Sequence, residues 1–62
     1  MLSTREKEVL RLVADGLPTK QISTSLSITE RTVEFHVNST FRKLGADNRA
    51  QAVALAAQRG LL

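Results

Sequence analysis

The sequence contains no cysteine, no tryptophan and no tyrosine, and it has a single proline. The absence of cysteine excludes disulfide bonds, a thiolate zinc site and a cysteine nucleophile. Phe35 and Phe41 are the only aromatic residues, so the core has to be built from aliphatic side chains. No apolar run approaches the roughly 20 residues that a helix needs to cross a bilayer, and no signal-peptide pattern follows Met1. We therefore expect a cytoplasmic protein with no membrane partner.

Size and charge narrow the function only partly. The 62 residues suffice for one domain spanning 1–62. A chain this short buries only about 60% of its unfolded surface, which leaves no spare core for a deep catalytic cavity. The net charge of +3 suits a polyanionic partner, although a plain solvated surface would have the same balance. Composition therefore permits a nucleic-acid partner without establishing one.

Helix start and stop signals predict four helices, of which the second is short. Ser3 and Glu6 have the spacing of a capping box, and Gly16 is suited to a left-handed helix end. Thr19 is the expected N-cap of a second helix, which ends at Ser27.

The third helix should run from 30 to 44 and the fourth from 49 to 58, with Asn48 capping the fourth and Gln51 completing a second capping box. Only two residues separate the second helix from Thr29, the expected N-cap of the third, so these helices have to cross steeply. The sequence thus predicts an all-α, four-helix domain of the helix-turn-helix type.

The helix predicted over 30–44 has two contrasting faces. At about 100° per residue, one face gathers core-forming residues: Val33, Val37, Thr40, Phe41 and Leu44. The opposite face holds Arg31, Glu34, Phe35, Asn38 and Arg42. Asparagine pairs with adenine, glutamate accepts from the cytosine amino group, and an apolar side chain meets the thymine methyl. We therefore assign base reading to Arg31, Glu34, Phe35 and Asn38; the alternative is a solvated face with one stray aromatic ring.

Several ordered motifs at matching spacing cover almost the whole chain. They are LSTREKEVL (2–10), GLPTKQIS (16–23), LSITERTVEFHV (26–37), KLG (43–45), NRAQAV (48–53) and RGLL (59–62). In these motifs the chain resembles the LuxR-type (NarL/FixJ, GerE-like) DNA-binding domain. The resemblance implies a recognition helix over about 30–44 that enters the major groove of double-stranded DNA. It also implies the C-terminal effector domain of a bacterial response regulator, preceded by a receiver or sensor domain and located at the nucleoid.

The contacts that the resemblance implies have to be transferred residue by residue. Family members commonly carry basic residues at the positions of Glu34 and Asn38, so guanine-centred reading is in doubt there, and lower non-specific affinity is expected. Hydroxyl and basic residues near the ends of the second and third helices are candidates for phosphate contacts. These candidates are Thr19, Lys20, Thr29, Thr32, Arg42 and Lys43.

The fourth helix is the expected contact of a weak homodimer, again by resemblance. Its two sides sort by helical periodicity into Ala52, Val53, Ala56 and Ala57, which should face the core, and a second set that should face the partner. The second set is Gln51, Ala54, Leu55 and Gln58. Small side chains allow close approach of another helix; the alternative is a helix with scattered surface alanines.

Enzymatic and metal chemistry find no support in the sequence. His36 is the only histidine, so a metal site lacks further ligands, and a structural role at the border of the core is the favoured interpretation. Glu6 and Glu8 lie two residues apart and point to different sides of a helix. We expect no enzyme and no cofactor. A protein-binding helical bundle remains the alternative, and a steep salt dependence would favour DNA.

Overall fold

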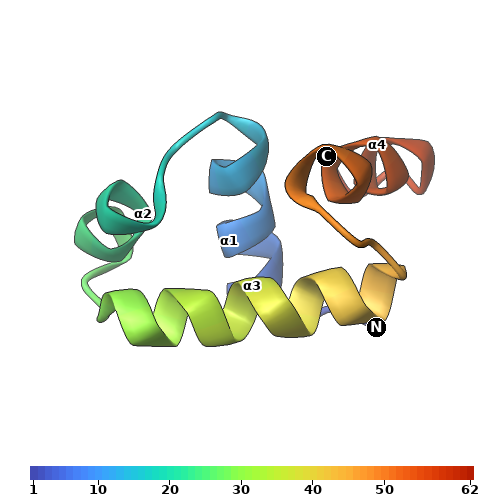
Figure 1. The fold of residues 1–62 in the computed structure, drawn as a ribbon. Coiled ribbons are helices and arrows are strands. Elements are labelled where there is room, and N and C mark those ends of the chain that lie inside the picture. The colour runs from blue at the N-terminus through green and yellow to red at the C-terminus, as the bar shows by residue number, and fades with distance from the viewer.

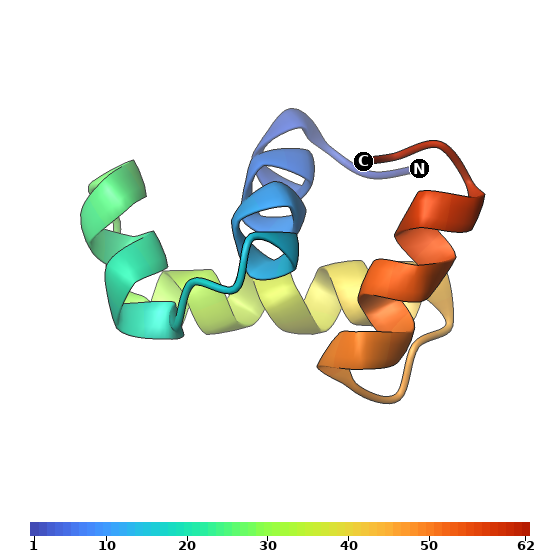
Figure 2. The same ribbon diagram turned by 90° about the horizontal axis from the view of Figure 1, so that it is seen from above.

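The computed structural model describes residues 1–62 and contains four α-helices: α1 (Thr4–Ala14), α2 (Thr19–Leu26), α3 (Glu30–Leu44) and α4 (Arg49–Gln58). α3 forms one layer, and α2, α1 and α4 lie in a row across it, with α1 in the middle (Figures 1 and 2). In both views a tight turn follows α2, and α3 then crosses α2 at a steep angle. The predicted all-α, helix-turn-helix architecture is confirmed. None of the four helices is both long and apolar enough to span a bilayer.

The predicted capping box starts α1. Ser3 Oγ accepts a hydrogen bond from the Glu6 amide at 3.1 Å, and Glu6 Oε1 accepts one from the Ser3 amide at 2.8 Å. Two otherwise unpaired amides at the helix start are thereby satisfied. The chain leaves the helix through Gly16, whose φ of +88° lies in the left-handed region that glycine occupies without strain.

The N-cap predicted for α2 is wrong by one residue. Pro18 is the N-cap, with extended backbone (φ −72°, ψ 161°), and its carbonyl accepts the Ile22 amide at 3.0 Å. Proline fits because its fixed φ matches this conformation and it lacks an amide that would need a partner. Thr19 is consequently the first helical residue. Ser27 ends α2 as predicted, in a left-handed conformation at φ 58°.

α3 and α4 have the predicted bounds, with one difference in the cap of α4. Asn48 Oδ1 accepts the Gln51 amide at 2.9 Å, as expected of an N-cap. The second capping box is absent, because Gln51 Oε1 accepts the amide of Asp47 instead of the amide of Asn48. The backbone at Asn48 is almost fully extended (φ −155°, ψ 173°), so the amide that faces the Gln51 side chain belongs to the preceding residue.

Two aliphatic clusters flank α1 and hold the layers together. The first, which also contacts Phe41, Ala46 and Leu61, consists of Leu2, Leu10, Leu44, Ala52 and Ala56. The second lies towards α2 and consists of Val9, Val13, Ile22 and Val33. α1 contributes to both clusters, so it is the element around which the other three helices pack. The predicted core face of α3 is confirmed, with Val37 and Phe41 half-buried at its margin.

The core side of α4 is narrower than predicted. Ala52 and Ala56 are fully buried and Val53 is half-buried, but Ala57 is exposed and Leu55 is half-buried. The reason is geometric. The buried direction bisects Ala52 and Ala56, and at about 100° per residue Val53 and Leu55 lie equally far from it on either side. Ala57 lies farther round the helix, so it faces solvent.

Thr40 provides a test of the core. Its side chain is 1% exposed, and its hydroxyl has no hydrogen-bond partner. Because an unsatisfied buried hydroxyl is costly, Thr40→Val, which keeps the shape, should raise the free energy of unfolding by about 1 kcal/mol. Urea unfolding followed by circular dichroism measures the change. In Thr24→Val, the matched control, an exposed hydroxyl bonded to the Lys20 carbonyl is removed, and stability should stay within about 0.5 kcal/mol. A destabilised Thr40→Val protein would contradict the assignment.

Candidate nucleic-acid interface

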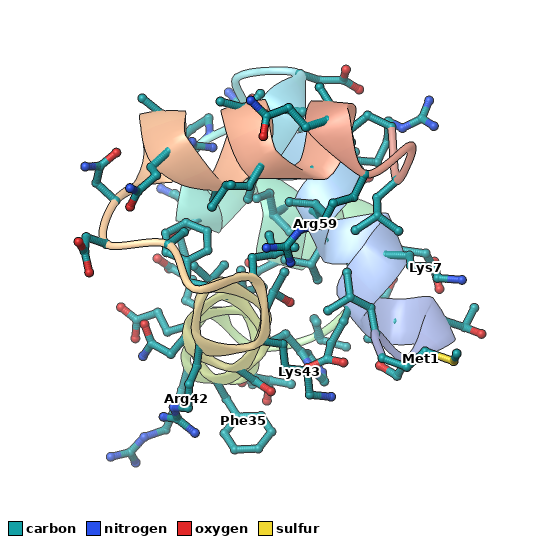
Figure 3. The ribbon with its side chains drawn as sticks, turned by 90° about the vertical axis from the view of Figure 1, so that its right-hand side faces the viewer. Met1, Lys7, Phe35, Arg42, Lys43 and Arg59 are labelled. Carbon is teal, nitrogen blue, oxygen red and sulfur yellow. The ribbon has the colours of Figure 1, made fainter.

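The face of α3 opposite the core is open to solvent. Phe35 is 68% exposed, an unusual environment for a large aromatic side chain in so small a protein. Arg31, Glu34 and Asn38 are exposed on the same face. Figure 3 shows Phe35 and Arg42 projecting away from the other three helices. The structure therefore brings all four residues predicted to read bases together on one accessible surface.

The layer arrangement explains why this face is free. α2, α1 and α4 all pack on the same side of α3, so the opposite side has no intramolecular neighbour (Figures 1 and 2). The Phe35 ring contacts the ring of the adjacent His36 edge to face, with the two ring centroids 5.6 Å apart. His36 is half-buried at the border of the core face, as predicted. Nothing in the fold covers the Phe35 ring.

Charges on the exposed face partly cancel. Arg31 and Arg42 are the cations, and Glu34 is the acid, so the face carries a small positive excess. Long-range attraction to a polyanion from this face is therefore weak. Asn38 and Phe35 add a neutral amide and an apolar ring between the charged side chains, and these suit short-range contacts.

The predicted phosphate-binding residues lie mostly at helix starts. No side chain caps the first turn of α2, so its leading amides have no partner within the helix, and the exposed Lys20 lies beside them. At the start of α3, Thr29 Oγ1 accepts the Thr32 amide at 3.1 Å and lies 2.9 Å from Thr32 Oγ1. One of these hydroxyls donates its proton to the other, so only one hydroxyl proton of the pair is free to reach a phosphate oxygen.

Lys43 has an intramolecular partner that the sequence analysis did not find. Its Nζ lies 2.8 Å from Glu6 Oε1 and 3.3 Å from the Met1 carbonyl oxygen, which accept hydrogen bonds from it. This ion pair joins the end of α3 to the start of α1. A role of Lys43 at phosphates would therefore have to be shared with its role in holding the fold.

Glu6 is the buried centre of a small polar network. Only 4% of the surface of Glu6 is exposed. Its carboxylate accepts hydrogen bonds from the Ser3 amide, the Ser39 hydroxyl (2.6 Å) and the Lys43 ammonium. The Lys43 ammonium contributes most to lowering the pKa of Glu6, followed by the Ser3 amide and the Ser39 hydroxyl, and burial opposes them. The pKa falls from 4.5 to about 2, so the carboxylate stays ionised in the folded protein far into acid.

Two arginines donate hydrogen bonds to main-chain carbonyls that lie far from them in the sequence, at or just beyond the C-terminal ends of helices. The Arg49 guanidinium donates to the carbonyls of Val13 and Leu17, and the Arg59 guanidinium donates to the Leu44 carbonyl at 3.1 Å. Cations near the C-terminal ends of helices satisfy unpaired carbonyls and interact favourably with the helix dipole.

These contacts were missed in the sequence, although Glu6 left a signal. It lies four residues after Leu2 and three before Val9, both buried, so a charged residue occupies a core position of the helix. A charge at such a position requires a partner from elsewhere in the chain. The sequence alone did not say which cation supplies it.

Comparison with known proteins finds similar sequences and similar structures that together cover the whole chain. The sequence profile described as "Bacterial regulatory proteins, luxR family" matches residues 1–56. Among solved structures, the response regulator ChrA of a heme-sensing two-component system superposes with a TM-score of 0.96 at 40% identity, over 100% of this chain and 31% of ChrA. The transcription factor GerE superposes with a TM-score of 0.91 at 39% identity, over 98% of this chain and 91% of GerE.

Curated relatives are longer than this chain. The transcriptional regulatory protein YdfI of Bacillus subtilis is 43% identical over 98% of the chain, and the transcriptional activator protein SolR of Ralstonia solanacearum is 47% identical over 100% of it. The aligned region makes up 29% of YdfI and 26% of SolR. The chain thus corresponds to one domain of these relatives.

The Glu6 network predicts a specific acid sensitivity. The unfolded chain protonates Glu6 below about pH 4.5, whereas the folded protein keeps it ionised to about pH 2. The unfolded state therefore binds more protons in this window, and the free energy of unfolding should fall as pH falls from about 4.5 to about 2. Urea midpoints for the wild type and Glu6→Gln should converge across this window. Glu8→Gln, which removes an exposed carboxylate outside any ion pair, should follow the wild-type profile. A constant difference between the wild type and Glu6→Gln would contradict the role of the network.

Proposed function

The chain belongs to the luxR family of bacterial regulatory proteins, and we propose that it binds double-stranded DNA sequence-specifically by inserting α3 into the major groove. The observation that carries the proposal is the open face of α3, where Phe35 is 68% exposed beside an amide and a carboxylate. This combination offers apolar and hydrogen-bonding contacts to base edges at one accessible surface. The proteins of this family are transcription regulators and not enzymes.

Each residue on the proposed base-reading face has a distinct preference. The Asn38 amide can both donate to and accept from adenine, and the Glu34 carboxylate accepts from the cytosine amino group. The Phe35 ring offers an apolar contact to the thymine methyl, and Arg31 suits guanine or a nearby phosphate. The proposed site is therefore mixed in composition and not rich in guanine at its centre.

Phosphate contacts hold the domain in register in this proposal. They come from the hydroxyl, amide and basic groups predicted in the sequence: Thr19, Lys20, Thr29, Thr32, Arg42 and Lys43. Lys20 and Arg42 are exposed and form no ion pair, so their charge is fully available. Lys43 is the weakest member of the set, because Glu6 already neutralises its ammonium.

The proposal extends to the longer protein to which such a domain belongs. The similarity to ChrA, which is a response regulator, and the larger size of YdfI and SolR support an upstream receiver or sensor domain. In that setting this chain is the output domain, and the sensor controls when α3 reaches DNA. A regulator of this kind acts at the nucleoid in the cytoplasm.

α4 is the proposed contact between two protomers on DNA. Gln51, Ala54 and Gln58 are exposed along one side of this helix, with Leu55 half-buried at its margin. The small Ala54 side chain would let another helix approach closely. The surface is limited, so we propose a weak dimer that forms chiefly when two half-sites are adjacent.

The proposed base-reading face can be tested at Asn38. With a duplex chosen by selection from random sequences, Asn38→Ala should cost about 1–3 kcal/mol of binding free energy and relax the preference at one base pair. The slope of log K against log salt should not change, because an amide neutralises no phosphate. Fluorescence anisotropy at two or more salt concentrations measures both quantities.

Lys20→Ala is the matched control for Asn38→Ala. It should weaken binding to all duplexes alike and reduce the salt slope by about one unit, because one phosphate contact is lost. If Asn38→Ala leaves sequence preference intact, the assignment of the face is wrong. If the wild type shows no salt dependence, binding to DNA itself is contradicted.

A further prediction concerns α4. Ala54→Glu should leave the affinity for a single half-site unchanged and weaken the binding of two protomers to adjacent half-sites by about tenfold or more, because like charges then oppose each other across the contact. Ala57→Glu adds the same charge about 60° round α4, outside the proposed contact set, and should have a smaller effect. Electrophoretic mobility shifts with one and two half-sites measure the cooperativity. Equal effects of the two variants would exclude α4 as proposed.

A further inference from the structure

A cavity lies beside the end of α3, apart from the proposed base-reading face. Its volume is about 280 Å³. Its apolar part is formed by Leu2 and Leu44, which belong to the first core cluster, and by Leu61, which packs against that cluster. Three basic residues, Lys7, Lys43 and Arg59, complete the lining together with Met1. Figure 3 shows these basic residues and Met1 around one side of the molecule, with Phe35 and Arg42 projecting below it.

The positive charge at this cavity is largely uncompensated. No acidic residue lines it, and Glu6, which lies close by, is already committed to Ser3, Ser39 and Lys43. Lys7 is exposed and forms no ion pair. The guanidinium of Arg59 donates to a main-chain carbonyl, which leaves its charge unpaired. Two unpaired cations and one shared cation therefore surround an aliphatic floor.

We infer that this cavity is a docking site for a segment of a partner protein in which an acidic side chain adjoins an aliphatic one. The aliphatic side chain would pack on Leu2, Leu44 and Leu61, and the carboxylate would lie between Lys7 and Arg59. The volume falls just below the roughly 300 Å³ at which small-molecule sites begin, which suits one or two side chains of a peptide. This inference goes beyond DNA binding and does not depend on it.

The chemistry favours a protein segment over a DNA phosphate. A phosphodiester has charge but no aliphatic group with which to cover the three leucines, so the apolar part of the lining would stay exposed to water. The position also matters. Lys7 and Arg59 lie on a different side of the molecule from Phe35 and Arg42, so a domain bound to DNA through α3 would leave both accessible, and only Lys43 would be shared with a phosphate (Figure 3). A partner acting beside the regulator on the same DNA could reach it.

The experiment uses the 62-residue chain labelled with ¹⁵N and a synthetic capped peptide in which pairs of leucines alternate with pairs of glutamates. A second peptide carries glutamine in place of each glutamate. We expect the acidic peptide to shift the amide signals of Leu2, Lys7 and Leu61 and to leave those of Glu34 and Asn38 unmoved. The glutamine peptide should bind at least about threefold more weakly, because it lacks the charge.

Lys7→Glu tests the charge directly. It should weaken binding of the acidic peptide by about threefold to tenfold. Arg11→Glu makes the same charge change one turn farther along α1, outside this cavity, and should weaken it much less. The two variants should bind duplex DNA equally well, which separates this inference from the proposed function.

Three results would overturn the inference. The glutamine peptide could bind as tightly as the acidic one, which would show that the leucines bind apolar side chains without any contribution from Lys7 and Arg59. The two charge variants could weaken the peptide equally, which would show a non-specific charge effect. Duplex DNA could displace the peptide and shift the same amides, which would make the cavity a phosphate contact.

Discussion

The carboxylate of Glu6 is the constraint that sets how α1, the central helix, lies along α3. It is buried, and it accepts hydrogen bonds from the chain before α1 and from Ser39 and Lys43 on α3. A buried charge is tolerated only when it is paired and its remaining oxygens are satisfied. Because both conditions are met, the contact has one favourable geometry, and it fixes the register of α1 along α3. Apolar packing alone would allow small slips that this network resists.

This anchoring matters because α3 can be held from one side only. The three other helices all pack on one face of α3 and leave the opposite face free, as the proposed recognition of DNA requires (Figures 1 and 2). The aliphatic clusters on either side of α1 supply most of the burial, and the alanines of α4 allow that helix to approach closely. The polar network lies at the edge of this packed surface. The two aliphatic clusters and the polar network together hold α3 in place, so that its exposed side chains project from a packed support.

Most of the fold was predictable from local signals, whereas the long-range polar contacts were not. Capping residues and helical periodicity fixed the bounds of α3 and α4 and separated the core face of α3 from its open face. Thr19 was misplaced because a preceding proline can cap a helix through its backbone alone. The pairing of Glu6 with Lys43 spans 37 residues, and nothing local to either residue identifies the other. The residues proposed to read bases were found because an exposed phenylalanine breaks the usual pattern of a surface.

The small net charge on the open face of α3 bears on how affinity would be shared in the proposed DNA complex. Two arginines lie beside one glutamate there, so in that complex this surface would contribute discrimination between bases more than general attraction to DNA. Attraction then has to come from helix ends and from the few unpaired cations, such as Lys20. One domain acting alone would bind weakly, whereas two domains on adjacent half-sites gain from effective concentration without any new contact. If α3 reads bases as proposed, a face of this composition works best in a paired regulator, where weak contacts on each half-site combine.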